Sequence, residues 1–134
     1  FRINETFATW VLNEGLLNSN ILLDTILSAK NKTQRIELYK KYDTQIRGGV
    51  LDTWLERAND SAYKQTKKAI ESGNNIVDIV IEFNQYYKSD TALARAYFER
   101  GLLFYYSNQT DSAKKYYQKS IEIALKRDEY KELA

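Results

Sequence analysis

Carboxylates, amines and phenols are the chemically active side chains of this sequence, which contains no Cys and no His. Without thiolate or imidazole, the chain lacks common nucleophiles, general bases and transition-metal ligands. Asp78 and Glu82 are four residues apart, so on a helix they would share one face and could hold a divalent cation or share a proton. This pair has no third ligand, and no Ser or Tyr has a recognisable activating base. We therefore expect neither an enzyme nor a metal or cofactor site.

The composition is typical of a single globular domain, with 134 residues of which 43% are hydrophobic and 28% charged. The longest apolar cluster, residues 76–81, is short and contains Asp78, so no transmembrane segment is expected. The absence of Met, even at position 1, suggests a fragment or a processed chain. The abundance of Asn, Lys, Ile and Tyr without Pro resembles the coding bias of an AT-rich bacterial genome. The compartment stays open between the cytoplasm and the bacterial cell envelope, with a lean towards the envelope.

The basic side chains do not indicate a nucleic-acid surface. The formal net charge is +2, and acids and bases are mixed along the chain. Lys64, Lys67 and Lys68 lie near Tyr63, a combination that also occurs on surfaces that bind single strands. Acidic residues flank this cluster and the similar cluster at Lys114–Tyr117, so both are interpreted as solvated helix faces. Nucleic acid is therefore not an expected partner.

The absence of Pro and the scarcity of Gly favour long helices. The fold class is predicted to be all-α, built of antiparallel helical hairpins. About seven helices are expected, over residues 4–17, 21–30, 31–47, 50–72, 75–88, 91–107 and from 110 onwards. The first of them carries Phe7, Trp10 and Val11 at helical spacing.

Capping residues set several of these boundaries. Asn31 followed three residues later by Gln34 predicts a capping box. The pair Gly48-Gly49 predicts a break, and Gly73 is placed at the C-terminal cap of the 50–72 helix. That helix is alternatively two helices, separated near residues 59–61. Asp90 is the expected N-cap of the sixth helix, and an acid at Asp111 with bases at Lys126 and Arg127 suits the dipole of the seventh.

Residues 75–88 combine two conflicting patterns. Their β-branched side chains favour a strand. However, Ile76, Val80, Phe83 and Tyr87 recur at i, i+4, i+7 and i+11, which is the spacing of one helix face. Helical spacing sustained over three turns outweighs propensity, so a helix is predicted here.

A short internal similarity joins residues 61–71 to residues 112–122 at an offset of 51. Ser, Ala, Lys, Lys, Ile and Glu are identical at six of the paired positions. This offset leaves room for one extra helix between two related hairpins, and a fixed period is the sequence signature of repeat proteins.

Aromatic and small residues alternate in the C-terminal part of the chain. The alternation runs through Tyr97, Gly101, Phe104, Ala113, Tyr117 and Ser120. Their order and spacing resemble one tetratricopeptide repeat over residues 94–125. The glycine supports this resemblance independently. Inside a helix it costs about 1 kcal/mol relative to Ala, and opposite Ala113 it would let two helix backbones approach closely.

The resemblance implies a superhelical array whose helices line a groove for a peptide or a helix of a partner protein. The positions that face the groove would be Arg95, Phe98, Leu102, Tyr105 and Tyr106. Phe98, Leu102 and Tyr105 fall at i, i+4 and i+7, so they form a second apolar face that must be buried. Either the 75–88 helix covers this face, through Phe83 and Tyr87, or a partner does.

Some positions depart from the pattern of the family. Arg100 stands where an aliphatic residue is usual, and Leu125 where Pro is common. Chaperone-binding members clamp a terminal carboxylate with Lys and Asn, and here Arg95 is the single plausible counterpart, so no clamp is expected. The predicted organisation is one helical domain over residues 1–134. It contains N-terminal helices in 1–47, a degenerate hairpin plus an extra helix in 50–88, and the hairpin that resembles a tetratricopeptide repeat (TPR-like hairpin) in 91–130.

Two functional hypotheses follow. In the first, the chain is a non-enzymatic scaffold for protein–protein interaction that binds a peptide or helix through its TPR-like groove. In the second, it is a structural or oligomerisation domain of a larger protein associated with the cell envelope. Both hypotheses name protein as the partner.

Overall fold

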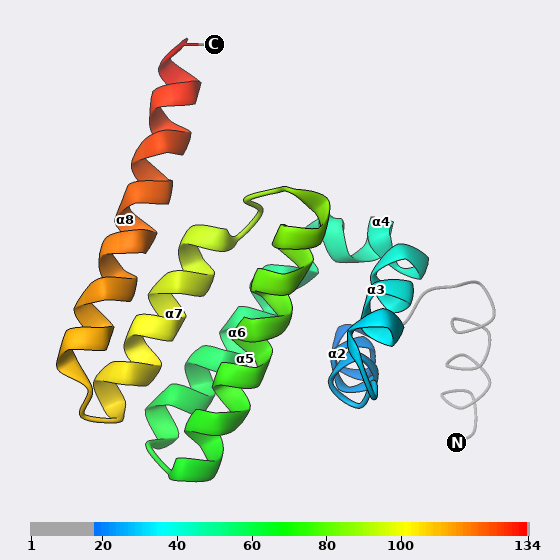
Figure 1. Cartoon of the computed structure of the whole chain (residues 1–134), viewed down its shortest axis with the longest axis horizontal. Helices are drawn as coiled ribbons and strands as arrows, with labels where there is room; N and C mark the ends of the chain where they lie inside the picture. Colours follow the sequence, from blue (N-terminus) through cyan, green and yellow to red (C-terminus); the bar gives the residue numbers. More distant parts are fainter. Residues whose placement is uncertain (1–17, 134) are drawn as a thin grey trace, which may run out of the picture. The chain divides into compact units, whose positions relative to one another are not determined.

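Helices make up the computed structural model, which describes residues 18–133 of the chain and the side chains of residues 18–128. Residues 18–50 form one compact unit and residues 51–133 form a second, and each is described by itself. The first unit contains α2 (Ser19–Leu27), α3 (Lys32–Lys41), α4 (Asp43–Gln45) and a turn over Ile46–Val50. The second contains α5 (Leu51–Lys64), α6 (Lys67–Tyr87), α7 (Leu93–Tyr106) and α8 (Thr110–Leu133) (Figure 1).

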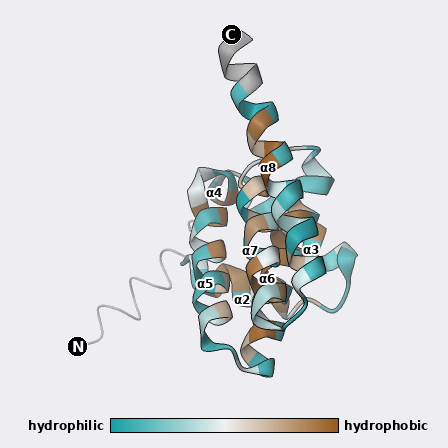
Figure 2. Ribbon diagram, turned by 90° about the vertical axis from the view of Figure 1, so that its left-hand side faces the viewer, coloured by the Kyte–Doolittle hydropathy of each residue, from teal (hydrophilic) through white to brown (hydrophobic). Residues whose placement is uncertain are grey.

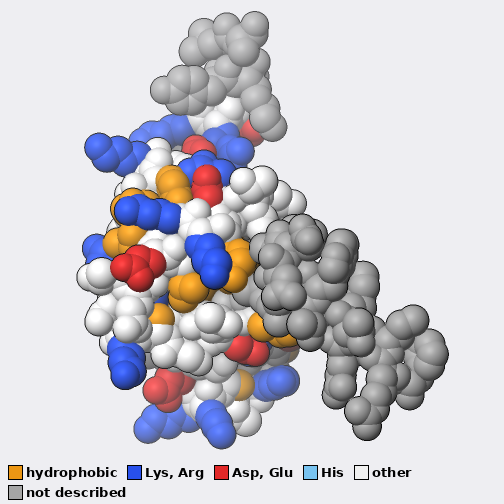
Figure 3. Space-filling model, turned by 90° about the vertical axis from the view of Figure 1, so that its right-hand side faces the viewer, with side chains coloured by type: hydrophobic (Ala, Val, Ile, Leu, Met, Phe, Trp, Pro, Cys, Tyr) orange, Lys and Arg blue, Asp and Glu red, His pale blue; other side chains and the backbone are white. Residues whose placement is uncertain are grey.

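The predicted fold class is confirmed, because residues 18–133 contain helices and no strand. The helix predicted over residues 4–17 lies outside the described residues, and a single domain over residues 1–134 stays a prediction. Within the described part, no helix is long and apolar enough to cross a membrane. On the face drawn in Figure 3, acidic side chains lie among the basic ones.

Side-chain caps begin both longer helices of the first unit. Asn18 Oδ1 accepts a hydrogen bond from the Asn20 backbone N–H at 2.9 Å. Asn31 Oδ1 accepts from the Gln34 N–H at 2.9 Å, as the capping box predicts. The return bond differs from the ideal motif, since Gln34 Oε1 accepts from the N–H of Lys30 at 2.8 Å.

The prediction of one continuous helix over residues 31–47 is wrong, because this stretch contains α3, α4 and the beginning of the turn at Ile46–Val50. The first helix of this stretch, α3, ends at Lys41, and the Tyr42 N–H still donates to the Leu38 carbonyl at 3.0 Å. The break at Gly48-Gly49 is confirmed, because Gly49 has φ of 106°, a conformation that side chains with a Cβ rarely adopt. This turn leads from the first unit into the second.

The boundaries predicted between residues 50 and 88 are also partly wrong. The chain turns at Gln65 and Thr66 rather than near residues 59–61, and the Thr66 hydroxyl accepts from the Ala69 N–H at 3.1 Å. Gly73 does not end a helix, because α6 continues through it to Tyr87.

Close packing explains why a glycine occurs inside α6. A Cβ on Gly73 would lie 2.8 Å from Leu103 Cδ2 and 3.3 Å from the Ala58 carbonyl oxygen. Contacts with two other helices therefore select glycine here, and the sequence pattern of a C-terminal cap is misleading.

The helical prediction for residues 75–88 is confirmed, although this segment is the continuation of α6 rather than a separate helix. Ile76, Val80 and Phe83 are fully buried, as expected for the inner face of an amphipathic helix. Figure 2 shows hydrophobic and hydrophilic positions alternating along the helices of this unit. The helix ends at Lys88, which adopts the left-handed conformation with φ of 50°.

The internal similarity at an offset of 51 does not correspond to equivalent structural elements. Residues 61–71 include the end of α5, a turn and the start of α6. Residues 112–122 lie within the uninterrupted α8. The identities therefore do not mark a repeated hairpin.

The connection into α7 uses a buried asparagine instead of the predicted cap at Asp90. Ala92 occupies the N-cap position with φ of 59° and makes no side-chain cap hydrogen bond. Asn84 Nδ2, near the end of α6, donates to the Thr91 carbonyl at 2.9 Å, and its Oδ1 accepts from the Ser89 hydroxyl at 2.8 Å. One side chain thus satisfies the backbone of the connecting turn.

The antiparallel α7–α8 hairpin has the close approach that the sequence predicts. A Cβ on Gly101 would lie 2.6 Å from two ring carbons of Tyr117 and 3.2 Å from the Ala113 carbonyl oxygen. The Ser120 hydroxyl donates to the Ala94 carbonyl at 2.6 Å and links the two helices further along. Beyond this contact α8 extends past the start of α7 (Figure 1).

The aromatic partner of Tyr97 and Phe104 is Tyr116. Its ring stacks on Tyr97 at a centroid distance of 6.0 Å and on Phe104 at 5.4 Å. Tyr117 lies instead over Gly101. The two adjacent tyrosines of α8 therefore pack on different sides of α7.

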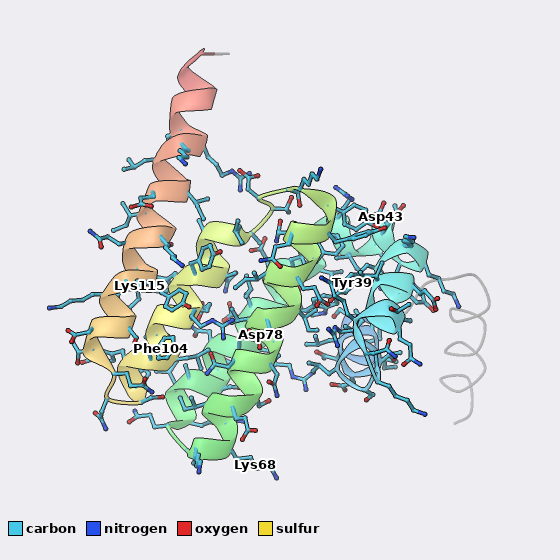
Figure 4. The ribbon with its side chains drawn as sticks, in the orientation of Figure 1. Tyr39, Asp43, Lys68, Asp78, Phe104 and Lys115 are labelled. Carbon is cyan, nitrogen blue, oxygen red and sulfur yellow. The ribbon has the colours of Figure 1, made fainter. Side chains whose placement is uncertain are left out.

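Arg100, which departs from the aliphatic residue of the family pattern, reaches α6. Its guanidinium forms an ion pair with Asp78, which is labelled on α6 in Figure 4, and donates to Asn74 Oδ1 at 2.7 Å. Its buried Nε has no hydrogen-bond partner among the described residues. The carboxylate is 60% exposed, so water also solvates it. This ion pair engages Asp78, one of the two acids that the sequence places on a single helix face with Glu82.

We expect Arg100→Met to keep the unfolding free energy within about 1 kcal/mol of the wild type, because an apolar side chain of similar length needs no partner. Asp78→Ala should cost more, about 1–3 kcal/mol, because it leaves the arginine charge without its carboxylate. Urea denaturation of both variants measures the two values. A larger loss for Arg100→Met than for Asp78→Ala would contradict this interpretation.

Candidate functional site

Two neighbouring helices of the second unit, α5 and α7, present matching stripes of side chains. On α5 the stripe consists of Asp52, Glu56, Asn59 and Tyr63. On α7 it consists of Arg95, Glu99, Leu102 and Tyr106. Both stripes have the spacing i, i+4, i+7 and i+11, and residues in one contact residues in the other. We call these eight residues, together with Phe98 and Tyr105, the α5–α7 surface.

One end of the α5–α7 surface is charged. Arg95 donates to Glu56 Oε2 at 2.6 Å and lies 3.5 Å from Asp52 Oδ1. Its Nε is 3.8 Å from Glu99 Oε1 on its own helix. Three carboxylates therefore surround one guanidinium, and the predicted site residue Arg95 already has partners within the chain.

Glu99 is the buried member of this cluster, with 2% of its surface exposed. Asn59 Nδ2 donates to both of its carboxylate oxygens, at 2.9 and 3.2 Å. Burial raises the pKa of Glu99, and the Asn59 hydrogen bonds and the Arg95 charge, which lower it, offset this effect only in part. Asn59 and Arg95 therefore hold the carboxylate in place, although its removal from water costs free energy.

The raised pKa of Glu99 predicts how the unfolding free energy depends on pH. Because the folded state binds the Glu99 proton more tightly than the unfolded state, this group favours folding most below its unfolded pKa. Its contribution falls as the pH rises through the higher folded pKa. Glu99→Gln should therefore reduce the loss of stability between acidic and neutral pH, measured by urea denaturation across that range. An unchanged pH profile would contradict the assignment, and Glu71→Gln at an exposed position on α6 is the control.

The other end of the α5–α7 surface is aromatic. Tyr106 meets Tyr63 edge to face at a centroid distance of 5.5 Å, and Tyr105 meets Tyr106 at 5.3 Å. Tyr63 is 57% exposed and Tyr105 is 55% exposed, while Leu102 beside them is buried. Rings held by their neighbours and open to solvent on one side offer large contact area with little loss of side-chain freedom.

Phe98 connects this aromatic end to α8. It is 46% exposed, and its ring lies 5.5 Å from that of Tyr117. Burial raises the pKa of the Tyr117 hydroxyl, and Tyr105, Tyr106, Glu99 and Tyr63 raise it further through their charges.

The structure brings the five predicted site residues into one region but divides them between two environments. Arg95, Leu102 and Tyr106 lie along α5, whereas Phe98 and Tyr105 are exposed. The 75–88 helix was one of two alternative covers for this face, and Phe98 and Tyr105 are 46% and 55% exposed in its presence. The contacts of α6 with α7 include Arg100 and Leu103. Whether a partner binds Phe98 and Tyr105 stays a prediction.

Six residues of this region were not among the predicted site residues. They are Asp52, Glu56, Asn59, Tyr63, Glu99 and, as a neighbour of the exposed rings, Tyr117. The regular spacing of the α5 stripe was visible in the sequence, but its pairing with α7 was not. Among the described residues, no group of three or more acidic side chains is arranged to hold a metal ion.

No protein-family model matches this chain, and neither the curated proteins nor the solved structures include a similar one.

Proposed function

We propose that this chain is a non-enzymatic interaction module, related to tetratricopeptide repeats, that binds a segment of another protein at the α5–α7 surface. The observation that supports this proposal most directly is the exposure of Phe98 and Tyr105 beside Tyr63. Exposed aromatic side chains gathered on one surface are typical of protein-binding sites, and Tyr is enriched among the residues that dominate binding energy.

The packing of the second unit supports the repeat relationship. The first helix of the hairpin, α7, packs on both α5 and α6 as well as on α8. The close approach at Gly101 and Ala113 has the physical role that the repeat pattern requires. In such an arrangement α5 and α7 together would line the face that receives the partner.

Panning of a random peptide library displayed on phage tests this proposal. Phe98→Ala with Tyr105→Ala should remove the enrichment of peptides obtained with the wild type, while both proteins keep similar thermal midpoints. The matched control is Tyr86→Ala, which removes a partly exposed ring from α6. Equal enrichment by the wild type and the double variant would exclude this surface as the binding site.

Oligomerisation is the second candidate function. Ile121 and Leu125 are each 58% exposed on α8, which extends past the start of α7. Apolar side chains in such a position favour contact between copies of the chain. Sedimentation velocity over a range of concentrations should show a larger species that Ile121→Ser with Leu125→Ser removes. A single monomeric species at all concentrations would contradict this function.

A further inference from the structure

Resting on the proposed function, we propose that the segment bound at the α5–α7 surface is basic at one end and apolar or aromatic at the other. Lys or Arg would lie against Asp52 and Glu56. Apolar or aromatic side chains would lie against Tyr63, Phe98 and Tyr105. The charge, the open ring faces and the order of the two along the helices each support this occupant.

Charge complementarity gives the sign of the partner. The cluster holds three carboxylates and one guanidinium, and so has a local charge of −2, although the whole chain has a formal charge of +2. Asp52 and Glu56 are each 62% exposed, and Arg95 engages one oxygen of each. A carboxylate accepts several hydrogen bonds, so both residues keep acceptor capacity towards solvent.

The structural role of these acids accounts for part of the arrangement. Asp52 lies in the first turn of α5, where a negative charge stabilises a helix. The Arg95–Glu56 pair fastens α7 to α5. Neither role uses three carboxylates around one cation, so the excess negative charge is the feature that a basic partner would neutralise.

The aromatic rings account for the apolar end of the partner. Tyr63, Phe98 and Tyr105 are each about half exposed, and apolar or aromatic side chains pack favourably on such rings. Glu99 and Tyr106 lie on the same stripe of α7, so the acidic and aromatic ends are continuous along this surface. A segment bound along it would therefore meet carboxylates at one end and ring faces at the other.

The acidic and aromatic ends of the surface lie a fixed distance apart, which sets the spacing between the basic and apolar parts of the bound segment. Asp52 and Tyr63 are separated by eleven residues along α5, or about 16 Å at a rise of 1.5 Å per residue. An extended segment covers that distance with about five residues and a helical one with about eleven. The basic and apolar parts of the partner should therefore be separated by such an interval.

The peptides enriched by the 134-residue chain in the panning experiment test this inference. We expect them to carry Lys or Arg towards one end and aromatic or aliphatic side chains towards the other. A synthetic, fluorescently labelled copy of the most enriched peptide should bind about tenfold more weakly to Asp52→Asn with Glu56→Gln, measured by fluorescence anisotropy. Added salt should weaken its binding to the wild type, because it screens the attraction between exposed charges.

The control variant is Glu71→Gln with Glu122→Gln, which makes the same change of charge at exposed positions on α6 and α8. It should bind the peptide like the wild type. Neutral or acidic peptides whose enrichment still depends on Phe98 and Tyr105 would overturn the inference and leave the proposed function standing. No enrichment that depends on these rings would overturn both. Self-association that Phe98→Ala abolishes would also overturn the inference, because a second copy would then be the occupant.

Discussion

Leu103→Ala is expected to lower the unfolding free energy of the second unit by about 3 kcal/mol. Deleting a buried leucine removes its transfer free energy and leaves a cavity, which together cost about 2–5 kcal/mol. Leu103 is fully buried, and it fills the space left open by the missing side chain of Gly73 on α6. Its loss should therefore weaken the contact between α6 and α7 directly.

Leu125→Ala provides the matched control for this measurement. It deletes the same atoms from α8, but its side chain is 58% exposed, so the cost should stay below about 0.5 kcal/mol. Chemical denaturation of the two variants, with equal slopes against denaturant, gives the difference. Equal losses at the two positions would mean that Leu103 is not a core residue.

Gly101→Leu is expected to destabilise the α7–α8 hairpin by about 2 kcal/mol, even though leucine is a better helix former than glycine. The first added carbon would lie 2.6 Å from the Tyr117 ring and 3.2 Å from the Ala113 carbonyl oxygen, so the ring or one of the helices must move. Overpacking of this kind typically costs about 1–3 kcal/mol. The gain in helix propensity, about 1 kcal/mol, offsets only part of it.

A double-mutant cycle with Tyr117→Ala identifies the group that causes the loss. Removing the ring should make Gly101→Leu less costly than in the wild-type background, because the ring contributes two of the nearest contacts. The carbonyl oxygen of Ala113 remains, so the relief should be partial. The same cost in both backgrounds would show that the tyrosine does not limit the approach of α7 and α8.

The sequence predicted the features that depend on neighbours along the chain. The capping box at Asn31 and Gln34 and the break at Gly48-Gly49 involve groups within a few residues of each other. The helical periodicity of residues 75–88 likewise needs no knowledge of other helices. The alternation of small and aromatic residues around Gly101 also predicted a close helix pair, because few other reasons favour glycine inside a helix.

Long-range contacts explain the predictions that failed. Gly73 has the sequence appearance of a helix end, but it lies in the middle of α6 because Leu103 and the Ala58 carbonyl fill the space beside it. Asp90 has the appearance of an N-cap, but Asn84 satisfies that turn from the preceding helix. In both cases a contact from another helix replaces the role that the local sequence predicts, a helix end at Gly73 and an N-cap at Asp90.

At the candidate site, helical spacing was enough to predict an all-helical chain, but it left open whether Phe98, Leu102 and Tyr105 are buried. The packing of the helices leaves the two aromatic rings exposed and buries the leucine. It also placed Asp52, Glu56 and Tyr63 beside α7, about forty residues away along the chain. The physical reason is that helix spacing specifies which side chains share a face, whereas packing between helices specifies which faces meet.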